Sequence, residues 1–295
     1  MQRYEWKKRD IGITMRLMLC FGILAVLYFI FLSVLAYVGV GMIALIFIGA
    51  FFILLQYLLS DRIVLWSTGA KIVSEHEYPR LHAIVDRLVA MAGLPKPRVA
   101  IIHTDVPNAF ATGKGRRSSV VAVTTGLMRI LNDEELEGVI AHELAHIKNR
   151  DVLAITLASI FSTIAWYVMH YGWYGTYGYR SRDQAGGLIL AIVIAAITWF
   201  VSFLIIRAIS RYREFIADRD GALLTGKPSK LASALMKISG MMNRIPSRDL
   251  REVESMNAFF IIPALSGDTL SRLFSTHPPV EERIRRLMEM EASMY

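Results

Sequence analysis

Two histidines stand four residues apart in the segment AHELAHIKNRD, with a glutamate directly after the first of them. On an α-helix, side chains at positions i and i+4 lie on the same face, so the rings of His142 and His146 can point at one ion. Neutral imidazoles suit Zn²⁺, and Glu143 is placed to act as a general base toward a water held there. The pattern predicts a hydrolytic zinc centre; the alternative is a helix with two surface histidines.

A catalytic zinc usually takes three protein ligands and leaves one position for water. Position 149 is Asn and position 152 is Val, so the spacing that adds a third histidine to the same motif is absent. The other histidines stand elsewhere in the chain, at His76, His82, His103, His170 and His277. The third ligand is therefore expected from a distant segment.

The segment SRYREFIADRDGA offers Glu214, with Asp218 four residues later on the same helical face. If straight helices continue into the neighbouring apolar segments, His142 and His146 lie about 15 and 9 Å before the apolar segment that starts at Val152. Glu214 lies about 12 Å beyond the apolar segment that ends at Ile206. These distances from the membrane edge agree, which favours Glu214 as the third ligand and Asp218 as the acceptor that orients a ligand ring. The alternatives are a surface carboxylate paired with a neighbouring arginine, and an ordinary salt bridge of Asp218.

The chain is rich in apolar residues: 54% of its 295 residues are hydrophobic, 20% are charged, and the mean hydropathy is +0.42. Residues 17–60 form 44 positions without a charge, about 66 Å as helix, or roughly twice the hydrocarbon core of a bilayer. We expect two spans there, near 13–37 and 42–59. Two further uncharged segments, Val152–His170 and Gln184–Ile206, are just long enough to span. Four transmembrane helices are predicted; the alternative for the last two is a hairpin buried in a large soluble core.

Lys and Arg residues near the ends of the spans predict the orientation, because short cytoplasmic loops are enriched in them. Five lie in the first 16 residues and three closely follow the fourth span, whereas residues 171–187 contain two. Both termini and the segments 60–151 and 207–295 are therefore expected on the cytoplasmic side. The net charge of +8 fits this orientation and anionic headgroups, and no nucleic-acid partner is expected. The only cysteine, Cys20, excludes an intrachain disulfide.

The segment between the second and third predicted spans, residues 60–151, contains sequence patterns typical of strands and helices. PRVAIIH and SVVAVTTGLM are rich in β-branched residues and predict strands of a small antiparallel sheet. Asn132 followed by Glu135 forms a capping-box pattern, so a helix is expected from about residue 133. The helix that carries the two histidines therefore has a defined start.

Four segments together carry a resemblance to a known family: AHELAHIKNRD, SRYREFIADRDGA, PNAFATG and FSTHPPVEERIRRL. With a pair of spans before and a pair between, they resemble the membrane zinc metalloproteases of the HtpX type, relatives of the CAAX prenyl proteases. The resemblance implies one zinc ion per chain, with His142, His146 and Glu214 as ligands. It also implies Glu143 as the base and Asp218 as the partner of a ligand.

Two further assignments follow from the same resemblance. Asn108, Ala109 and Phe110 resemble the edge strand that pairs with the substrate backbone, and a plain β-edge is the alternative. His277, which precedes two prolines, resembles a histidine near the site that donates to the oxyanion or to the carboxylate ligand. A helix-capping or core role is the alternative for this histidine.

The expected fold is an integral membrane α-helical protein with four transmembrane helices and a cytoplasmic α+β gluzincin-like zinc metalloprotease domain that contains the small antiparallel sheet. Residues 1–60 form an N-terminal transmembrane hairpin. Residues 61–151 form a protease part with the edge strand and the HExxH helix. Residues 152–206 form a second transmembrane hairpin, and residues 207–295 form a helical protease part with the third ligand.

The expected function is that of a membrane-embedded zinc metalloendopeptidase. Its substrates are membrane proteins or unfolded polypeptides cleaved on the cytoplasmic side of the bilayer, as in quality control of misfolded membrane proteins. One alternative is processing of lipidated C-terminal peptides, for which four spans are few because a lipid chain needs a large enclosed chamber. Another is a non-catalytic zinc-stabilised scaffold, which needs a fourth protein ligand. No oligomeric state is predicted.

Overall fold

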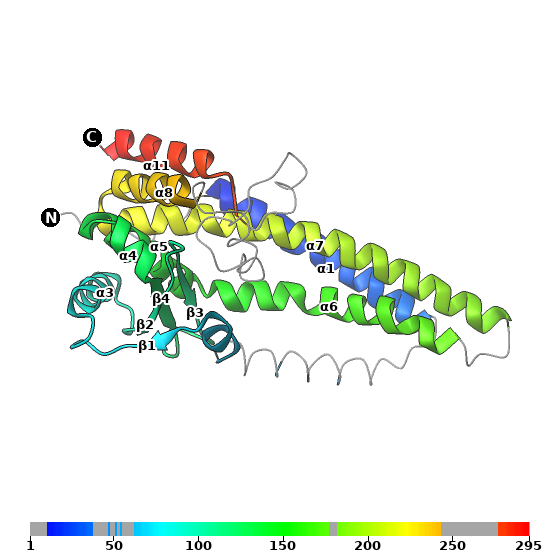
Figure 1. Cartoon of the computed structure of the whole chain (residues 1–295). Coiled ribbons are helices and arrows are strands. Elements are labelled where there is room, and N and C mark those ends of the chain that lie inside the picture. Colours follow the sequence, from blue (N-terminus) through cyan, green and yellow to red (C-terminus); the bar gives the residue numbers. More distant parts are fainter. Residues whose placement is uncertain are drawn as a thin grey trace. The chain divides into compact units, whose positions relative to one another are not determined.

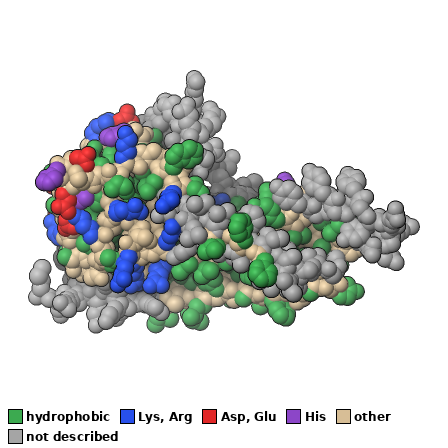
Figure 2. Space-filling view, turned by 90° about the horizontal axis from the view of Figure 1, so that it is seen from below, with side chains coloured by type: hydrophobic (Ala, Val, Ile, Leu, Met, Phe, Trp, Pro, Cys, Tyr) green, Lys and Arg blue, Asp and Glu red, His purple; other side chains and the backbone are tan. Residues whose placement is uncertain are grey.

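The computed structural model describes residues 11–37, 62–176, 182–242 and 277–294, together with the single helical residues 47, 51 and 54. The chain divides into two compact units. We call them the α/β unit, built from Leu59–Leu153 and Ser210–Tyr295, and the helical unit, built from Ile11–Leu58 and Ala154–Ile209. Charged side chains gather on the α/β unit, and hydrophobic ones line the surface of the helical unit (Figure 2).

Four strands form the sheet of the α/β unit, in the order β1-β2-β4-β3 (Figure 1). They are β1 (Lys71–Ile72), β2 (Arg98–Ile102), β3 (Ala109–Thr112) and β4 (Val120–Thr124). The two outer pairs, β1 with β2 and β3 with β4, are antiparallel, but the central pair β2 and β4 is parallel. The expectation of an antiparallel sheet is therefore wrong for the central pair.

The hairpin of β3 and β4 explains this topology. All five residues of β4 (VVAVT) are buried, which suits a central strand covered on both faces. The second strand of the hairpin therefore lies beside β2, and the first is left at the edge. Strand β3 is thus an edge strand.

The two faces of the sheet pack into different clusters, because successive side chains of a strand point to opposite sides. Val121 and Val123 of β4 join the larger cluster, which includes residues of the helices α3 (Pro79–Ala92), α5 (Asp133–Asn149) and α8 (Pro228–Met242). Val120 and Ala122 join a smaller cluster that includes Phe110 and Val64. The short helix α4 (Thr125–Ile130) follows β4 directly, and α11 (Val280–Met294) packs against α8.

Helix α5 begins where the capping-box pattern predicts. The Asn132 side chain accepts a hydrogen bond from the backbone N–H of Glu135, and the Glu135 carboxylate accepts one from the N–H of Asn132, each at 3.0 Å. These two bonds satisfy N–H groups that otherwise have no partner in the first turn. The predicted start of the helix is confirmed.

The end of α5 differs from the expected straight continuation. Arg150 adopts the left-handed conformation, with φ 54°, and a second helix, α6 (Asp151–Thr176), begins directly after it. A left-handed residue ends a helix because its carbonyl no longer follows the helical path. The Arg116 guanidinium donates to the Lys148 carbonyl at 2.6 Å, which satisfies one of the last carbonyls of α5. The single rod assumed for the height estimate is therefore interrupted.

The helical unit contains α1 (Ile11–Tyr37), most of α6 and the first part of α7 (Arg182–Thr225). Phe31 and Leu35 of α1 pack with Ala165 of α6 and with two alanines of α7, Ala191 and Ala195. Small residues at such contacts allow apolar helices to approach closely. Within this unit, Tyr28 also donates a hydrogen bond to the Ala158 carbonyl at 2.7 Å.

Three helices of the described residues are long and apolar enough to cross a membrane: Ile11–Tyr37, Asp151–His170 within α6, and Gly186–Thr225 within α7. They coincide with the predicted first, third and fourth spans. The predicted second span, near 42–59, lies outside the described residues except for three isolated positions. Helix α7 has 44 residues, more than a bilayer requires, and its last part belongs to the α/β unit.

Candidate metal centre

Three side chains of types that can hold a metal ion meet in the α/β unit. His142 and His146 come from α5 and Glu214 comes from α7, and one ligand atom of each lies within 4.8 Å of the others. The Nε2 atoms of the two histidines are 3.1 Å apart. Oxygens of the Glu214 carboxylate lie 3.7 Å from Nε2 of His142 and 3.5 Å from Nε2 of His146. Ligand atoms about 2.1 Å from a tetrahedral zinc lie about 3.4 Å from one another, so the donor set fits such an ion.

Helix α7 presents three residues to α5 on one face. Glu214, Asp218 and Gly221 stand at positions i, i+4 and i+7, which share a helical face. A Cβ atom on Gly221 would lie 2.8 Å from the backbone nitrogen of His142, so only glycine allows the two helices to approach this closely. This close approach holds Glu214 near the two imidazoles.

Each histidine ring is oriented by a carboxylate. His142 Nδ1 lies 2.9 Å from Asp218, the predicted partner of a ligand, and His146 Nδ1 lies 2.6 Å from Asp151. A carboxylate on Nδ1 leaves Nε2 to face the metal and makes the ring a better ligand. Burial alone would lower the pKa of His146, but the hydrogen bond with Asp151 and the nearby carboxylates raise it to about 9.

Sequence reasoning missed Asp151. Five residues after His146 on a continuous helix, its side chain would lie about 140° around the axis from the histidine. The left-handed Arg150 turns the chain back, so that Asp151 starts α6 beside His146. Asp151 also forms an ion pair with Arg213, which donates in addition to the Asn149 carbonyl at 3.0 Å. This cluster fixes the junction between α5 and α6.

Glu143 is buried beside the three donors, with 4% of its surface exposed. Burial raises the pKa of its carboxyl, and the nearby Glu214 carboxylate raises it further. The imidazoles and a hydrogen bond from the backbone of Ala111 act in the opposite direction. A carboxyl group with a raised pKa is suited to accept a proton and release it again near neutral pH.

The outer edge of β3 lies next to this carboxylate. The Asn108 carbonyl accepts from the N–H of Thr124 at 2.9 Å, so residue 108 faces β4. Backbone groups alternate along an antiparallel pair, so Phe110 also faces β4, whereas Ala109 and Ala111 face outward. The side chain of Phe110 packs into the smaller cluster of the sheet. Of the three residues expected to bind substrate, only Ala109 therefore turns its backbone groups away from β4. Ala111, which was not among the three, does so as well.

The C-terminal segment also reaches the three donors. His277 Nδ1 lies 3.2 Å from Glu214, and Arg283 Nη1 lies 3.3 Å from the same oxygen. Arg283 also holds Asp218 through two hydrogen bonds of 2.6 and 2.8 Å. It is 1% exposed, and although burial alone would lower its pKa, the charges of Asp218 and Glu214 raise it.

Arg283 was also missed from the sequence, although a signal was present. Val280, Ile284 and Leu287 form the apolar stripe of α11 at i, i+4 and i+7 spacing, and they pack on the larger cluster. Arg283 stands within this stripe, where a charged residue is out of place unless it has a buried partner. That partner is the pair Asp218 and Glu214.

Replacing Arg283 by methionine is expected to destabilise the protein by about 3–5 kcal/mol, because two buried carboxylates lose their compensating charge. Arg285 is the control: its pairs with Glu282 and Glu289 are at the surface, and surface pairs contribute at most about 1 kcal/mol. Thermal unfolding of the purified protein with each substitution measures the difference. Equal unfolding midpoints for the two variants would contradict the role given to Arg283.

Comparisons with known proteins agree with this geometry. The model of peptidase family M48 matches residues 75–291. Protease HtpX homolog 2 of Methanosarcina mazei is 53% identical over 98% of this chain and 99% of its own length, and the Protease HtpX homolog of Moorella thermoacetica is 53% identical over 97% and 96%. The crystal structure of S. mikatae Ste24p matches with a TM-score of 0.58 and 18% identity. That match covers 92% of this chain and 64% of Ste24p, so this chain spans less than two thirds of the length of that protein.

A group of two histidines and a glutamate that could hold a metal ion thus occurs in a chain with membrane-length helices. The sequence of this chain is half identical to HtpX proteases over nearly its whole length. The likeness to Ste24p concerns the fold alone. The chain belongs to peptidase family M48 and is a multi-pass membrane metallopeptidase of the HtpX type.

Proposed function

We propose that the protein is a zinc endopeptidase in which His142, His146 and Glu214 hold one Zn²⁺ ion. The observation that carries the proposal is the grouping of these donors within 4.8 Å, with Glu143 buried beside them. Two imidazoles and one carboxylate form a zinc ligand set that leaves a position open. When bound, the ion supplies a Lewis acid that polarises a peptide carbonyl and makes water a nucleophile at neutral pH.

The residues around the ion divide the remaining work. Glu143 accepts the proton of the attacking water and passes it to the leaving amine, because its carboxyl pKa is raised by burial. Asp218 and Asp151 hold the two imidazoles in the orientation that presents Nε2. His277, which lies 3.2 Å from Glu214, is placed to keep that carboxylate in position and to donate toward a developing oxyanion.

The substrate binds as an added strand on the outer edge of β3. Ala109 turns its backbone N–H and C=O groups toward this edge, and Ala111 turns its C=O group there, because the Ala111 N–H is bonded to Glu143. In the described part of the chain no other strand pairs with this edge. Pairing through the backbone holds an extended peptide with little dependence on its side chains. Asn108 and Phe110 shape this edge through their bonds to β4. The peptide bond beside Ala111 then lies next to Glu143, which is hydrogen-bonded to that residue.

We further propose that the substrates are membrane proteins and unfolded polypeptides, cleaved on the cytoplasmic side in quality control of misfolded membrane proteins. The distribution of Lys and Arg near the span ends supports this orientation. Four spans, including the one predicted near 42–59, then place both termini on the cytoplasmic side. A peptidase anchored in this way has access to the cytoplasmic loops of membrane proteins that have unfolded.

Sealed vesicles of known orientation test both the activity and the side. With zinc present, casein added outside is expected to be cleaved by inside-out vesicles, which expose the cytoplasmic face, and not by right-side-out vesicles. Detergent should make the two preparations equally active. Cleavage only by right-side-out vesicles would reverse the orientation, and no cleavage after detergent would argue against the peptidase. A prenylated peptide cleaved much faster than casein would favour the processing of lipidated C-terminal peptides.

A further inference from the structure

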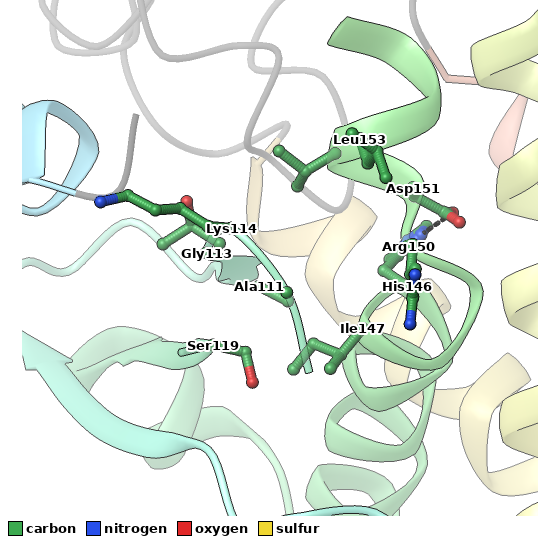
Figure 3. Close-up of a pocket in the computed structure, with 12 residues that line it drawn as sticks. Ala111, Gly113, Lys114, Ser119, His146, Ile147, Arg150, Asp151 and Leu153 are labelled. Atoms are coloured by element: carbon green, nitrogen blue, oxygen red, sulfur yellow. Dashed lines mark hydrogen bonds and ion pairs between the residues drawn. The ribbon is translucent and has the colours of Figure 1, made fainter. Parts of the chain in front are cut away.

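A pocket opens in the α/β unit at the C-terminal end of β3. It encloses about 330 Å³ of empty space, part of which is open solvent, and His146 contributes to its lining. Residues of the β3–β4 hairpin, Gly113 and Lys114 among them, form one side, and Ile147 and Leu153 lie across from them on the helices (Figure 3). The surface accessible inside the pocket is almost entirely apolar. It is thus an apolar pocket directly beside the metal centre.

On the hairpin side of the pocket, the wall at Gly113 is formed by backbone alone. Gly113 has φ 133°, a conformation that other residues rarely adopt, and a Cβ atom there would lie 2.6 Å from the Cα of Ser119. No side chain can therefore project from this position. The helical side is formed by side chains, with Ile147 in the last turn of α5 and Val152 and Leu153 in the first turn of α6. The side chains on the helical side therefore determine how deep and how apolar the pocket is.

The direction of β3 relates the pocket to the bond that is cleaved. The strand runs from Ala109 through Ala111, which contacts Glu143, toward Gly113 at the pocket. A substrate strand that pairs with β3 in the antiparallel sense, as β4 does, places its N-terminal side toward Gly113. At about 3.3 Å per residue, the pocket lies about one to three residues from the bond beside Glu143.

We propose that this pocket binds an apolar side chain of the substrate, about one to three residues on the N-terminal side of the cleaved bond. The inference rests on the proposed strand pairing and adds a side-chain preference to it. Burial of a leucine-sized side chain against Ile147, Val152 and Leu153 removes apolar surface from water. The backbone pairing supplies affinity for any extended peptide, and the pocket selects among sequences.

Leu153 is the residue to change, because it lies in the wall of the pocket and outside the metal-binding group. Leu153→Trp fills the pocket, and Leu153→Ala enlarges it. Leu157→Trp is the matched control: this leucine stands one turn further along α6, is 52% exposed, and does not line the pocket. Zinc content and thermal unfolding of each variant show whether its structure is kept.

The test uses fluorogenic peptides that differ only in the three residues before the cleaved bond, with Ala, Leu, Phe, Asp or Lys at each. The wild type and Leu157→Trp are expected to prefer Leu over Asp about 10-fold in kcat/KM at one of these positions. Leu153→Trp should shift the preference to Ala and Leu153→Ala should shift it to Phe, mainly through KM. Opposite shifts in size preference are not expected from a residue that only stabilises the fold.

Unchanged preferences in both Leu153 variants would overturn the proposal, and so would a wild-type preference for Asp or Lys at all three positions. Casein hydrolysis is measured in parallel. If the wild type cleaves casein but shows no apolar preference, the pocket assignment fails and the proposed function stands. If casein is not cleaved by the zinc-loaded wild type, the proposed function itself fails.

Discussion

Replacing Glu143 by glutamine is expected to lower peptide hydrolysis by roughly 10²- to 10⁴-fold, the range that a positioned general base contributes. The amide has nearly the same shape as the carboxyl group and can still accept the hydrogen bond from Ala111, so the edge strand should keep its place. An amide cannot take a proton from water near neutral pH, so the loss should appear in kcat. Glu143 is not among the three donors, so the variant should retain its zinc.

The control for this substitution is Glu137→Gln on the same helix. Glu137 forms an ion pair with Arg87 at the surface side of α5, away from the metal-binding group. Its turnover and zinc content should match those of the wild type. Assays of casein hydrolysis and metal analysis by mass spectrometry give both values. Wild-type turnover in the Glu143 variant would refute the role of this residue as the base.

Replacing Glu214 by alanine is expected to remove both the metal and the activity. The carboxylate is the only donor in the group that does not come from α5, and two imidazoles alone leave zinc with half of its tetrahedral ligands. His142→Ala should have the same effect. Asp218→Asn should keep the ligands but weaken zinc binding, by about 10- to 100-fold, because the amide no longer holds the His142 ring as a carboxylate does.

Asp220 provides the control for the loss of metal. It is another buried acid of α7, but it pairs with Lys148 at 3.0 Å and lies outside the donor group. Asp220→Asn should therefore retain zinc at one ion per chain. Metal content after dialysis against a competing chelator distinguishes the variants. Full zinc occupancy in the Glu214 variant would show that another residue supplies the third ligand.

The metal-binding helix could be predicted because its geometry is local. The spacing of His142 and His146 within one helix places both rings on one face, whatever surrounds the helix. The capping box at Asn132 and Glu135 is likewise contained in four residues. The candidate spans depend on the length of an apolar run, which is also a property of contiguous sequence.

The pairing of Glu214 with the histidines required a comparison of two separate segments. It was suggested by estimated heights above the apolar segments, which assumed straight helices. The structure brings these residues together although α5 ends at Asn149, because Gly221 lets α7 approach the backbone of α5 closely. The assumption about the helix was wrong, and the placement of Glu214 beside the two histidines agrees with the prediction.

The supporting shell of the site was decided by tertiary structure. Asp151 reaches His146 because one residue, Arg150, adopts a left-handed conformation, and no periodic pattern signals such a dihedral angle. Arg283 reaches Asp218 across 65 positions of the chain because α11 packs on α8. Strand β3 becomes the edge because the fully buried β4 occupies the centre of the sheet. Spacing along the chain determines which side chains share a face of one element, whereas contacts between elements depend on how their apolar faces pack together.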